Sequence, residues 1–351
     1  MSVICKKIEN TEQLISLEKQ WENLNNRANH GCIFTSPLWL LTWYKTYWQN
    51  NWQLNCYAFF HQDNLVALFP FYYQRNNNWI EQNNLFLLGQ GEPEAMEVAS
   101  EYVDLLILKP FKDDVFNLFF EQKWQTNLNS FFSRAIKPEA NITSLIQADT
   151  TIFSQQNAGT RYYIATNNWN IKTLSKNNVN RYKRSRNQLA KLNAEFYWVS
   201  PKQHTSYWHK MKQFHQTRWQ KKKLPGAFSS KQFESFHLTL LAQRDKTAIS
   251  ALSVNGEVIA IHYYLQDENT CYFYQSGWNE EKYNKLSPGF ALHLWSIEHC
   301  NKQYYDFMMG PVNDSYKGKF KCQESPMYNL AINFSPVRNK VAKILQKIAT
   351  N

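Results

Sequence analysis

The dipeptide Asn255-Gly256 is the feature that most limits how this chain can fold. It separates two runs rich in aliphatic and aromatic residues, residues 248–254 and 257–265. Both residues tolerate the positive φ that a two-residue hairpin turn requires, so this pattern predicts a β-hairpin. A third such run, residues 271–278, follows a short polar turn. We therefore expect the runs at 257–265 and 271–278 to be antiparallel neighbours in one sheet.

Helical patterns alternate with strand patterns along the whole chain. In the first half, helices are predicted at 11–24, 36–48 and 113–124, and strands at 54–60, 65–73, 85–88 and 102–108. In the second half, helices are predicted at 179–192, 207–220, 231–243 and 287–300, and a further strand at 304–308. A chain of 351 residues exceeds what one core usually organises. The sequence predicts an α/β (α+β) fold of two tandem domains, 1–155 and 156–351, whose mixed, largely antiparallel central sheets are flanked by helices.

Charge is distributed unequally between the halves. Residues 1–150 contain 11 Lys and Arg against 16 Asp and Glu, and residues 151–351 contain 28 against 12, so the net charges are −5 and +16. This asymmetry favours a phosphate-rich or acidic partner for the second half, such as coenzyme A, an acyl carrier protein, a nucleotide-sugar or RNA. Solubility alone is the alternative explanation for scattered lysines.

Several classes of protein are disfavoured by the sequence. The first ten residues lack the apolar region of a secretory signal, and the most apolar runs are of strand length, so we expect a cytoplasmic protein without a membrane span. The six cysteines form no Cys-x-x-Cys pair and have no His at metal-ligand spacing. We expect reduced thiols and no metal.

The segment from residue 251 to residue 320 resembles a known family. Its motifs are NGEVIA at 255–260, YFYQSGW at 272–278, LSPG at 286–289, YDFMMG at 305–310 and YK at 316–317. In this order they resemble the GNAT-like acyltransferases of cellulose and exopolysaccharide synthesis, the CelD/BcsL group, which are related to the FemABX peptidyltransferases. The likeness extends over roughly residues 175–325. It implies that the two domains are GNAT-like and that the chain transfers an acyl group.

The expected donor site lies at the start of the helix after residue 286. Ser287 and Pro288 suit the N-cap and first helical position, which would leave the amides of Gly289 and Phe290 pointing at a ligand. The resemblance places the coenzyme A pyrophosphate here, although Leu286 replaces the family's Gln or Arg; an ordinary capped helix is the alternative. Two arginines on one face of the basic helix predicted at 179–192 are expected to bind the same phosphates: Arg181 and Arg184.

The expected catalytic residues come partly from the resemblance. Lys317 and Tyr316 match the aromatic-Lys pair of FemABX proteins, in which the Lys is thought to stabilise the acyl oxyanion and the Tyr would protonate the leaving thiolate. His215 is a candidate general base. Asp104 and Asp306 lie in apolar runs, where a carboxylate needs a partner, so each is either catalytic or orients an arginine. Two further arginines are expected to contact the acceptor: Arg186 and Arg218.

The leading hypothesis is an acyltransferase that moves an acetyl or other acyl group from acyl-CoA to an amine or hydroxyl of a sugar or glycan precursor. The sequence lacks Gly-x-Ser-x-Gly, Walker and metal motifs, which favours direct attack without a covalent enzyme intermediate. Two alternatives stay open. One is a FemABX-type transferase that uses aminoacyl-tRNA, which the +16 half would suit, and the other is a non-catalytic binding protein with a degenerate GNAT fold.

Overall fold

The computed structural model describes residues 2–76, 82–146, 152–312, 316–336 and 339, and these divide into two compact units. Unit 1 contains residues 2–93 and 99–158 together with the segment from residue 326 onward, and unit 2 contains residues 94–98 and 159–325. The sequence predicted a single boundary between residues 155 and 156, and it did not predict that the segment after residue 325 belongs to unit 1. None of the described helices is both long and apolar enough to cross a bilayer.

Unit 1 combines two groups of strands with four helices. One sheet has the order β1-β3-β4-β7 and is antiparallel throughout, and a second group runs β15-β8-β6-β5-β2 with a parallel β6–β8 pair. The strands are β1 (Ile4–Ile8), β2 (Trp52–Leu54), β3 (Cys56–His61), β4 (Asn64–Phe69), β5 (Phe71–Asn76), β6 (Gln82–Leu87), β7 (Leu106–Ile107), β8 (Ser130–Ile136) and β15 (Gln323–Asn333). The helices are α1 (Thr11–Ser16), α2 (Glu18–Arg27), α3 (Pro37–Tyr47) and α4 (Lys112–Glu121).

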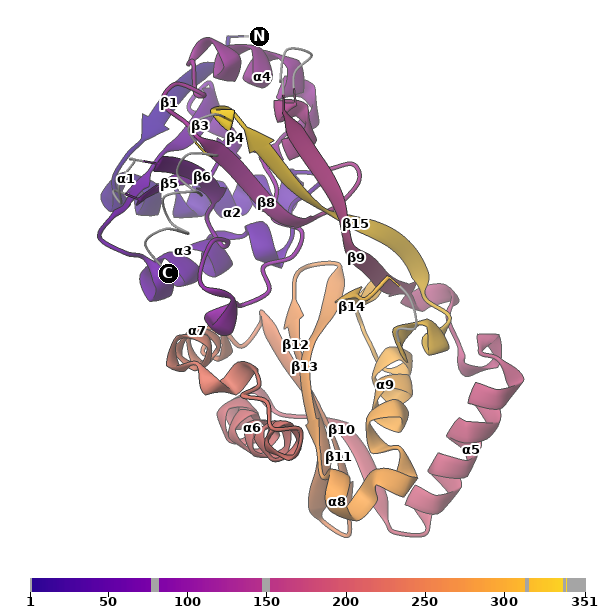
Figure 1. Cartoon of the computed structure of the whole chain (residues 1–351). Helices are drawn as coiled ribbons and strands as arrows, with labels where there is room; N and C mark the ends of the chain where they lie inside the picture. The colour runs from indigo at the N-terminus through magenta and orange to yellow at the C-terminus, as the bar shows by residue number, and fades with distance from the viewer. Residues whose placement is uncertain (1, 77–81, 147–151, 313–315, 337–338, 340–351) are drawn as a thin grey trace. The chain divides into compact units, whose positions relative to one another are not determined.

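Unit 2 is built on one mixed sheet with helices on both faces. The strand order is β10-β11-β12-β13-β14-β9, in which only the β13–β14 pair is parallel. The strands are β9 (Phe153–Ala165), β10 (Ala194–Trp198), β11 (Thr247–Val254), β12 (Glu257–Gln266), β13 (Thr270–Trp278) and β14 (Tyr304–Gly310). The helices are α5 (Lys176–Ala190), α6 (His204–Lys221), α7 (Lys231–Leu241), α8 (Glu280–Tyr283) and α9 (Pro288–Glu298). Helices α6 and α7 lie on one side of β12 and β13, and α9 with α5 lies on the other (Figure 1).

The predicted fold class and the predicted hairpin are both confirmed. Strands β11 and β12 are antiparallel neighbours, and the turn between them has φ of 48° at Asn255 and 79° at Gly256. Strand β12 in turn pairs antiparallel with β13. Both units are mixed α/β, because local turn chemistry and apolar patterning fix which segments become strands while the helices supply the second layer.

The parallel pair β13–β14 separates soon after it begins. Its residues pair only at Thr270–Tyr304, Cys271–Tyr305 and Tyr272–Asp306, although both strands continue beyond these positions. In β14 the register against β9 shifts between Asp306 and Met309, and Met308 has a left-handed φ of 62°. Such a bulge bends the strand that carries it. The two strands therefore diverge toward the end of the sheet at which α9 begins.

Gly277 allows α6 to pack against β13. A Cβ at this position would lie 2.5 Å from the backbone oxygen of Met211 and 3.0 Å from Cβ of Phe214. The helix backbone cannot move away without disturbing the packing on this face of the sheet. Only glycine fits here without a shift of α6.

We expect Gly277→Ala to destabilise the protein by about 1–3 kcal/mol, as overpacking against a fixed backbone does. Chemical denaturation measures the change. Gly318→Ala is the control, because the nearest atom to its added Cβ is Oε1 of Glu324 at 3.9 Å. Equal stability of the two variants would contradict this account of the α6–β13 contact.

Candidate active site

A pocket of about 360 Å³ lies in unit 2 at the first turn of α9. Its wall there is formed by Ser287, Pro288, Gly289 and Phe290. Residues of α5, α6, β12 and β13 complete the wall, together with the 3₁₀ turn Tyr316–Phe320. The pocket therefore occupies the region in which the start of α9 meets the strands of the central sheet.

Ser287 occupies the N-cap position but does not cap the helix, contrary to the sequence prediction. Its φ of 49° and ψ of 52° are left-handed, and its side chain makes no capping hydrogen bond. Instead its hydroxyl accepts a hydrogen bond from Nη2 of Arg181 at 3.0 Å. The serine thereby holds a guanidinium beside the positive end of α9.

Two arginines at the pocket are stacked on aromatic rings. The guanidinium of Arg181 lies 4.6 Å from the ring centroid of Phe290, and that of Arg218 lies 4.3 Å from that of Trp278. Lys319 adds a third cation to the lining. None of the described residues that line the pocket is acidic. Planar guanidinium groups held in this way suit phosphate or carboxylate groups of a ligand.

The structure brings to this pocket six of the residues for which the sequence predicted a binding or catalytic role: Arg181, Arg218, Ser287, Gly289, Phe290 and Tyr316. The roles assigned to them stay predictions. Gly289 leaves room for a ligand, because a Cβ there would meet only Trp278 and His262 at 3.8 and 3.9 Å. Tyr316 is 46% exposed, yet desolvation around its hydroxyl raises its pKa.

Arg184, Arg186 and His215 are not part of the described lining. Arg184 is exposed on α5, and Arg186 donates to the hydroxyl of Tyr182 at 2.9 Å. His215 is buried in α6 against Phe228, and burial, followed by the charge of Arg218, lowers its pKa to about 4. These positions give no support to their expected roles in binding or proton transfer.

Lys317 lies next to the pocket residues in sequence but turns toward strand β14. Its ammonium group donates to the backbone oxygens of Phe307 at 2.6 Å and Met308 at 3.2 Å, and also to that of Met309. These carbonyls belong to the part of β14 that has separated from β13. Lys317 thus satisfies the bulged strand, and a role at an acyl oxyanion would require it to leave these carbonyls.

Asp306 orients an arginine, which was one of the two roles considered from the sequence. The carboxylate is fully buried and accepts from Nε of Arg161 in β9 at 2.7 Å. Its other oxygen accepts the backbone N–H of Met308 at 2.7 Å. Asp306 therefore fixes the bulge of β14, and it is not among the described residues that line the pocket.

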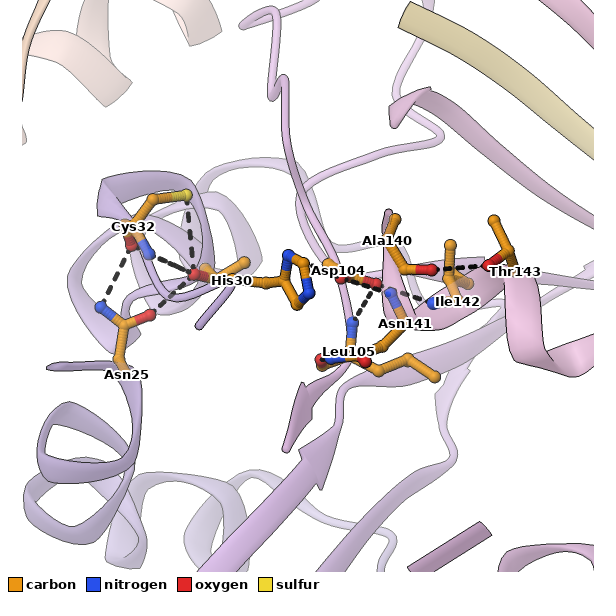
Figure 2. A network of polar contacts seen from close by, with 10 residues as sticks. Asn25, His30, Cys32, Asp104, Leu105, Ala140, Asn141, Ile142 and Thr143 are labelled. Atoms are coloured by element: carbon orange, nitrogen blue, oxygen red, sulfur yellow. Dashed lines mark hydrogen bonds and ion pairs between the residues drawn. The ribbon is translucent and has the colours of Figure 1, made fainter. Parts of the chain in front are cut away.

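Asp104 lies in unit 1, at a junction of backbone segments. Its carboxylate accepts the N–H groups of Leu105, Asn141 and Ile142 at 2.7–2.9 Å, and Nδ1 of His30 is 3.9 Å away (Figure 2). Burial raises the pKa of Asp104 to about 7, although the three backbone donors favour the ionised form. The carboxylate joins the strand region before β7 to a 3₁₀ turn and is not brought to the pocket lining.

Sequence analysis missed the two histidines of the pocket, His262 of β12 and His293 of α9. Both are almost fully buried, and their ring centroids are 4.1 Å apart. Burial lowers the pKa of His262 to about 3, and burial, together with His262 and Lys317, lowers that of His293 well below its usual value. The only sequence signal was a single histidine within each of two apolar runs, which commonly marks a structural residue.

We expect Lys317→Ala to lower the free energy of unfolding by about 1–3 kcal/mol, because the carbonyls of β14 lose a charged donor. Denaturant titration measures this, with Lys319→Ala as the control. Lys319 lines the pocket and is exposed, so its removal should change stability by less than about 0.5 kcal/mol. Unchanged stability of the Lys317 variant combined with lost turnover would instead favour the oxyanion role.

We expect stability to fall as the pH drops below about 6.5. His215, His237 and His262 have pKa values lowered to about 4, 3 and 3, so the unfolded chain binds protons that the folded chain does not. At pH 5 each would cost up to about 2 kcal/mol relative to pH 7. Asp104 has the opposite effect: its raised pKa means that the folded chain binds a proton that the unfolded chain does not, so its contribution to stability rises as the pH falls from about 7 to 4. Urea titrations at pH 5, 6 and 7 test the sum, and His237→Gln should flatten the curve; a curve that rises toward pH 5 would refute it.

Comparison with known proteins bears on this half of the chain most directly. Residues 176–318 match the model of the acetyltransferase (GNAT) domain, whereas a comparison with curated protein sequences finds no match. FemX shares the fold with a TM-score of 0.64 at 7% identity, over 97% of this chain and 99% of that chain. A conserved protein of unknown function from Bacteroides thetaiotaomicron has a TM-score of 0.59 at 11% identity, over 94% of this chain and 100% of that chain.

A third solved structure is the C-terminal domain of a putative lysylphosphatidylglycerol synthetase from Agrobacterium fabrum, with a TM-score of 0.53 at 10% identity, over 94% of this chain and 96% of that one. At such identities these likenesses establish the fold alone. Membership in the CelD/BcsL group stays a prediction. Most of the residues that form the pocket lie within the segment 176–318, which is similar to the acetyltransferase (GNAT) domain.

Proposed function

We propose that the protein transfers an acyl group from an acyl-CoA, such as acetyl-CoA, to an amine or hydroxyl of a sugar or glycan precursor. The observation that carries the proposal is the cationic pocket at the start of α9, beside the point at which β13 and β14 diverge. The pocket suits the thioester end of a long, thin pantetheine arm, and the helix end with Arg181 suits its diphosphate.

The same geometry supports direct attack on the thioester. The pocket has a volume of about 360 Å³, enough for the reacting ends of two substrates. Arg218 and Trp278 also line a second pocket of about 260 Å³, formed by α6 and the residues after β13. In this proposal the donor phosphates bind at Arg181, and the acceptor approaches the thioester from the side of Arg218.

A second donor is favoured by the charge of the pocket. Three cations with no acidic neighbour among the described lining would also suit the phosphates or the 3′ end of an aminoacyl-tRNA. The two donors differ in size and in salt dependence, since tRNA binding releases many counterions. Binding experiments with each donor therefore separate the two functions.

We expect CoA and acetyl-CoA to bind the full chain in isothermal titration calorimetry, and Arg181→Met to weaken this binding by about tenfold. Arg184→Met is the matched comparison, because Arg184 lies on the same helix, is exposed and does not belong to the described lining. Its affinity should stay within about twofold. Equal losses in the two variants would point to a diffuse charge effect and not to a phosphate site at α9.

Failure of CoA to bind, with tight and salt-sensitive binding of aminoacyl-tRNA, would replace the first donor by the second. The absence of binding for both donors would refute a transferase that uses this pocket.

A further inference from the structure

A continuous set of hydrogen bonds lies beneath the pocket and joins the two buried histidines. Nδ1 of His293 is 2.9 Å from the hydroxyl of Tyr305, and that hydroxyl is 3.3 Å from the hydroxyl of Tyr264. The hydroxyl of Tyr264 is in turn 3.3 Å from Nδ1 of His262. The chain runs from α9 through β14 to β12, and it begins and ends at imidazoles that line the same pocket.

The donors and acceptors available along this chain indicate which atoms carry the protons. The hydroxyl of Tyr305 donates to that of Tyr264, and because a hydroxyl has one hydrogen, Tyr305 must accept from Nδ1–H of His293. The neutral imidazole of His293 then has an unprotonated Nε2. Its lone pair belongs to the side of the ring that is not engaged by Tyr305.

The opposite tautomer follows for the second histidine. Ser296 donates to Ser250, and Ser250 lies 3.0 Å from the hydroxyl of Tyr264. Each hydroxyl has an acceptor only if Ser250 donates to Tyr264 and Tyr264 donates to Nδ1 of His262. His262 therefore has its proton on Nε2, the atom that lies 3.9 Å from the position of a Cβ on Gly289.

Neither Nε2 atom has a hydrogen-bond partner among the residues that the structure describes. The hydrogen bonds given for both rings are made by Nδ1, while both side chains form part of the pocket wall. The pocket thus presents one imidazole acceptor and one imidazole donor, 4.1 Å apart between ring centroids. Such a pair can contact both the attacking group and the leaving group of one reaction.

We propose that His293 and His262 are the proton acceptor and the proton donor of the transfer reaction, connected by Tyr305 and Tyr264. As the acceptor's N–H or O–H attacks the acyl carbon, its proton moves to Nε2 of His293, the new C–N or C–O bond forms and the C–S bond breaks. Nδ1 of His293 gives its proton to Tyr305, Tyr305 to Tyr264, and Tyr264 to Nδ1 of His262. Nε2–H of His262 protonates the leaving thiolate.

Atoms and charges balance in this scheme. The products are the acylated acceptor and free thiol, and the only change left in the protein is an exchange of tautomers between the two imidazoles. The starting state returns when water in the pocket takes the proton from Nε2 of His293 and supplies one to Nε2 of His262 while the protons between the two Nδ1 atoms shift back along the chain. Because protons shift along the chain together, neither buried ring has to become an imidazolium. This agrees with the lowered pKa values, which reflect the high cost of a charge here.

The neighbouring titratable groups favour neutral rings as well. Lys317 of the 3₁₀ turn lowers the pKa of His293, and the hydroxyls of Tyr264 and Tyr305 have pKa values raised by burial. Tyr316 lies with its ring centroid 6.1 Å from that of His293. No carboxylate is among the groups that shift the pKa of either histidine.

The tautomers can be measured without any substrate, which separates this test from that of the proposed function. Long-range ¹H–¹⁵N correlation spectra of the full chain with ¹⁵N-labelled histidine should show His293 protonated at Nδ1 and His262 at Nε2, both neutral from pH 5 to 8. The signals are assigned by His262→Gln and His293→Gln. Identical tautomers, or an imidazolium at pH 7, would overturn the proposal even if CoA binds.

The catalytic role itself rests on the proposed function and is tested by thiol release from acetyl-CoA, with glucosamine as the probe acceptor. His262→Gln and His293→Gln should each lower kcat by about 10²–10⁴-fold while CoA affinity in calorimetry stays within threefold. The double variant should be no slower than either single variant, since the two residues act as a unit. Tyr305→Phe should lower kcat and remove the tautomer preference of His293, a spectral change that a purely structural role would not produce.

His204→Gln is the control, because His204 is buried in α6 but bonded to the backbone oxygen of Val199 at 3.3 Å, outside the described pocket lining. Its kcat should remain within about threefold of the wild-type value. Additive losses in the double variant, or a His204 variant as slow as the others, would overturn the paired mechanism. Failure of CoA to bind in the wild-type chain would count against the proposed function alone.

Discussion

The structure of unit 2 depends on the early separation of its one parallel strand pair. Strands β13 and β14 share three paired positions and then part, so the carbonyls of β14 beyond Asp306 cannot be satisfied by β13. Unpaired backbone groups inside a protein are costly. Lys317 donates to three of these carbonyls, and Asp306 accepts an N–H from within the bulge. The opening at the end of the sheet is thus stabilised by side chains that the sequence suggested for chemistry.

The basic residues in and near the pocket differ in the groups that hold them. Lys317 and Arg161 have protein partners at β14, whereas Arg181 stacks on Phe290 and donates from one nitrogen to Ser287, and Arg218 stacks on Trp278. Stacking fixes the plane of a guanidinium and leaves its N–H groups able to bind an anion. Whether a basic residue bonds to the backbone or is able to bind an anion therefore depends on its surroundings and not on its charge alone.

Much of the secondary structure was predictable because its causes are local. The turns at Asn255-Gly256 and Gln62-Asp63 have positive φ at both central residues, as hairpins require, and Pro37 starts α3 after a true serine cap at Ser36. At Ser287 the same type of motif failed as a cap, because the serine side chain is taken by Arg181, a residue 106 positions away. Strands β9 and β15 were also missed, since their pairing partners lie far away in the sequence.

The sequence by itself determined the α/β class, the β11–β12 hairpin and the segment that forms the start of α9, because turn residues and apolar periodicity act over a few positions. It also predicted that the basic second half has a phosphate-rich or acidic partner. Only the tertiary structure decided which polar residues meet. It directed Asp104, Asp306 and Lys317 to backbone and ion-pair partners, and it brought His262 and His293 together from a strand and a helix that are 31 residues apart along the chain. The surroundings of a side chain, which fix its protonation and its partners, depend on chain folding over long distances that no local pattern records.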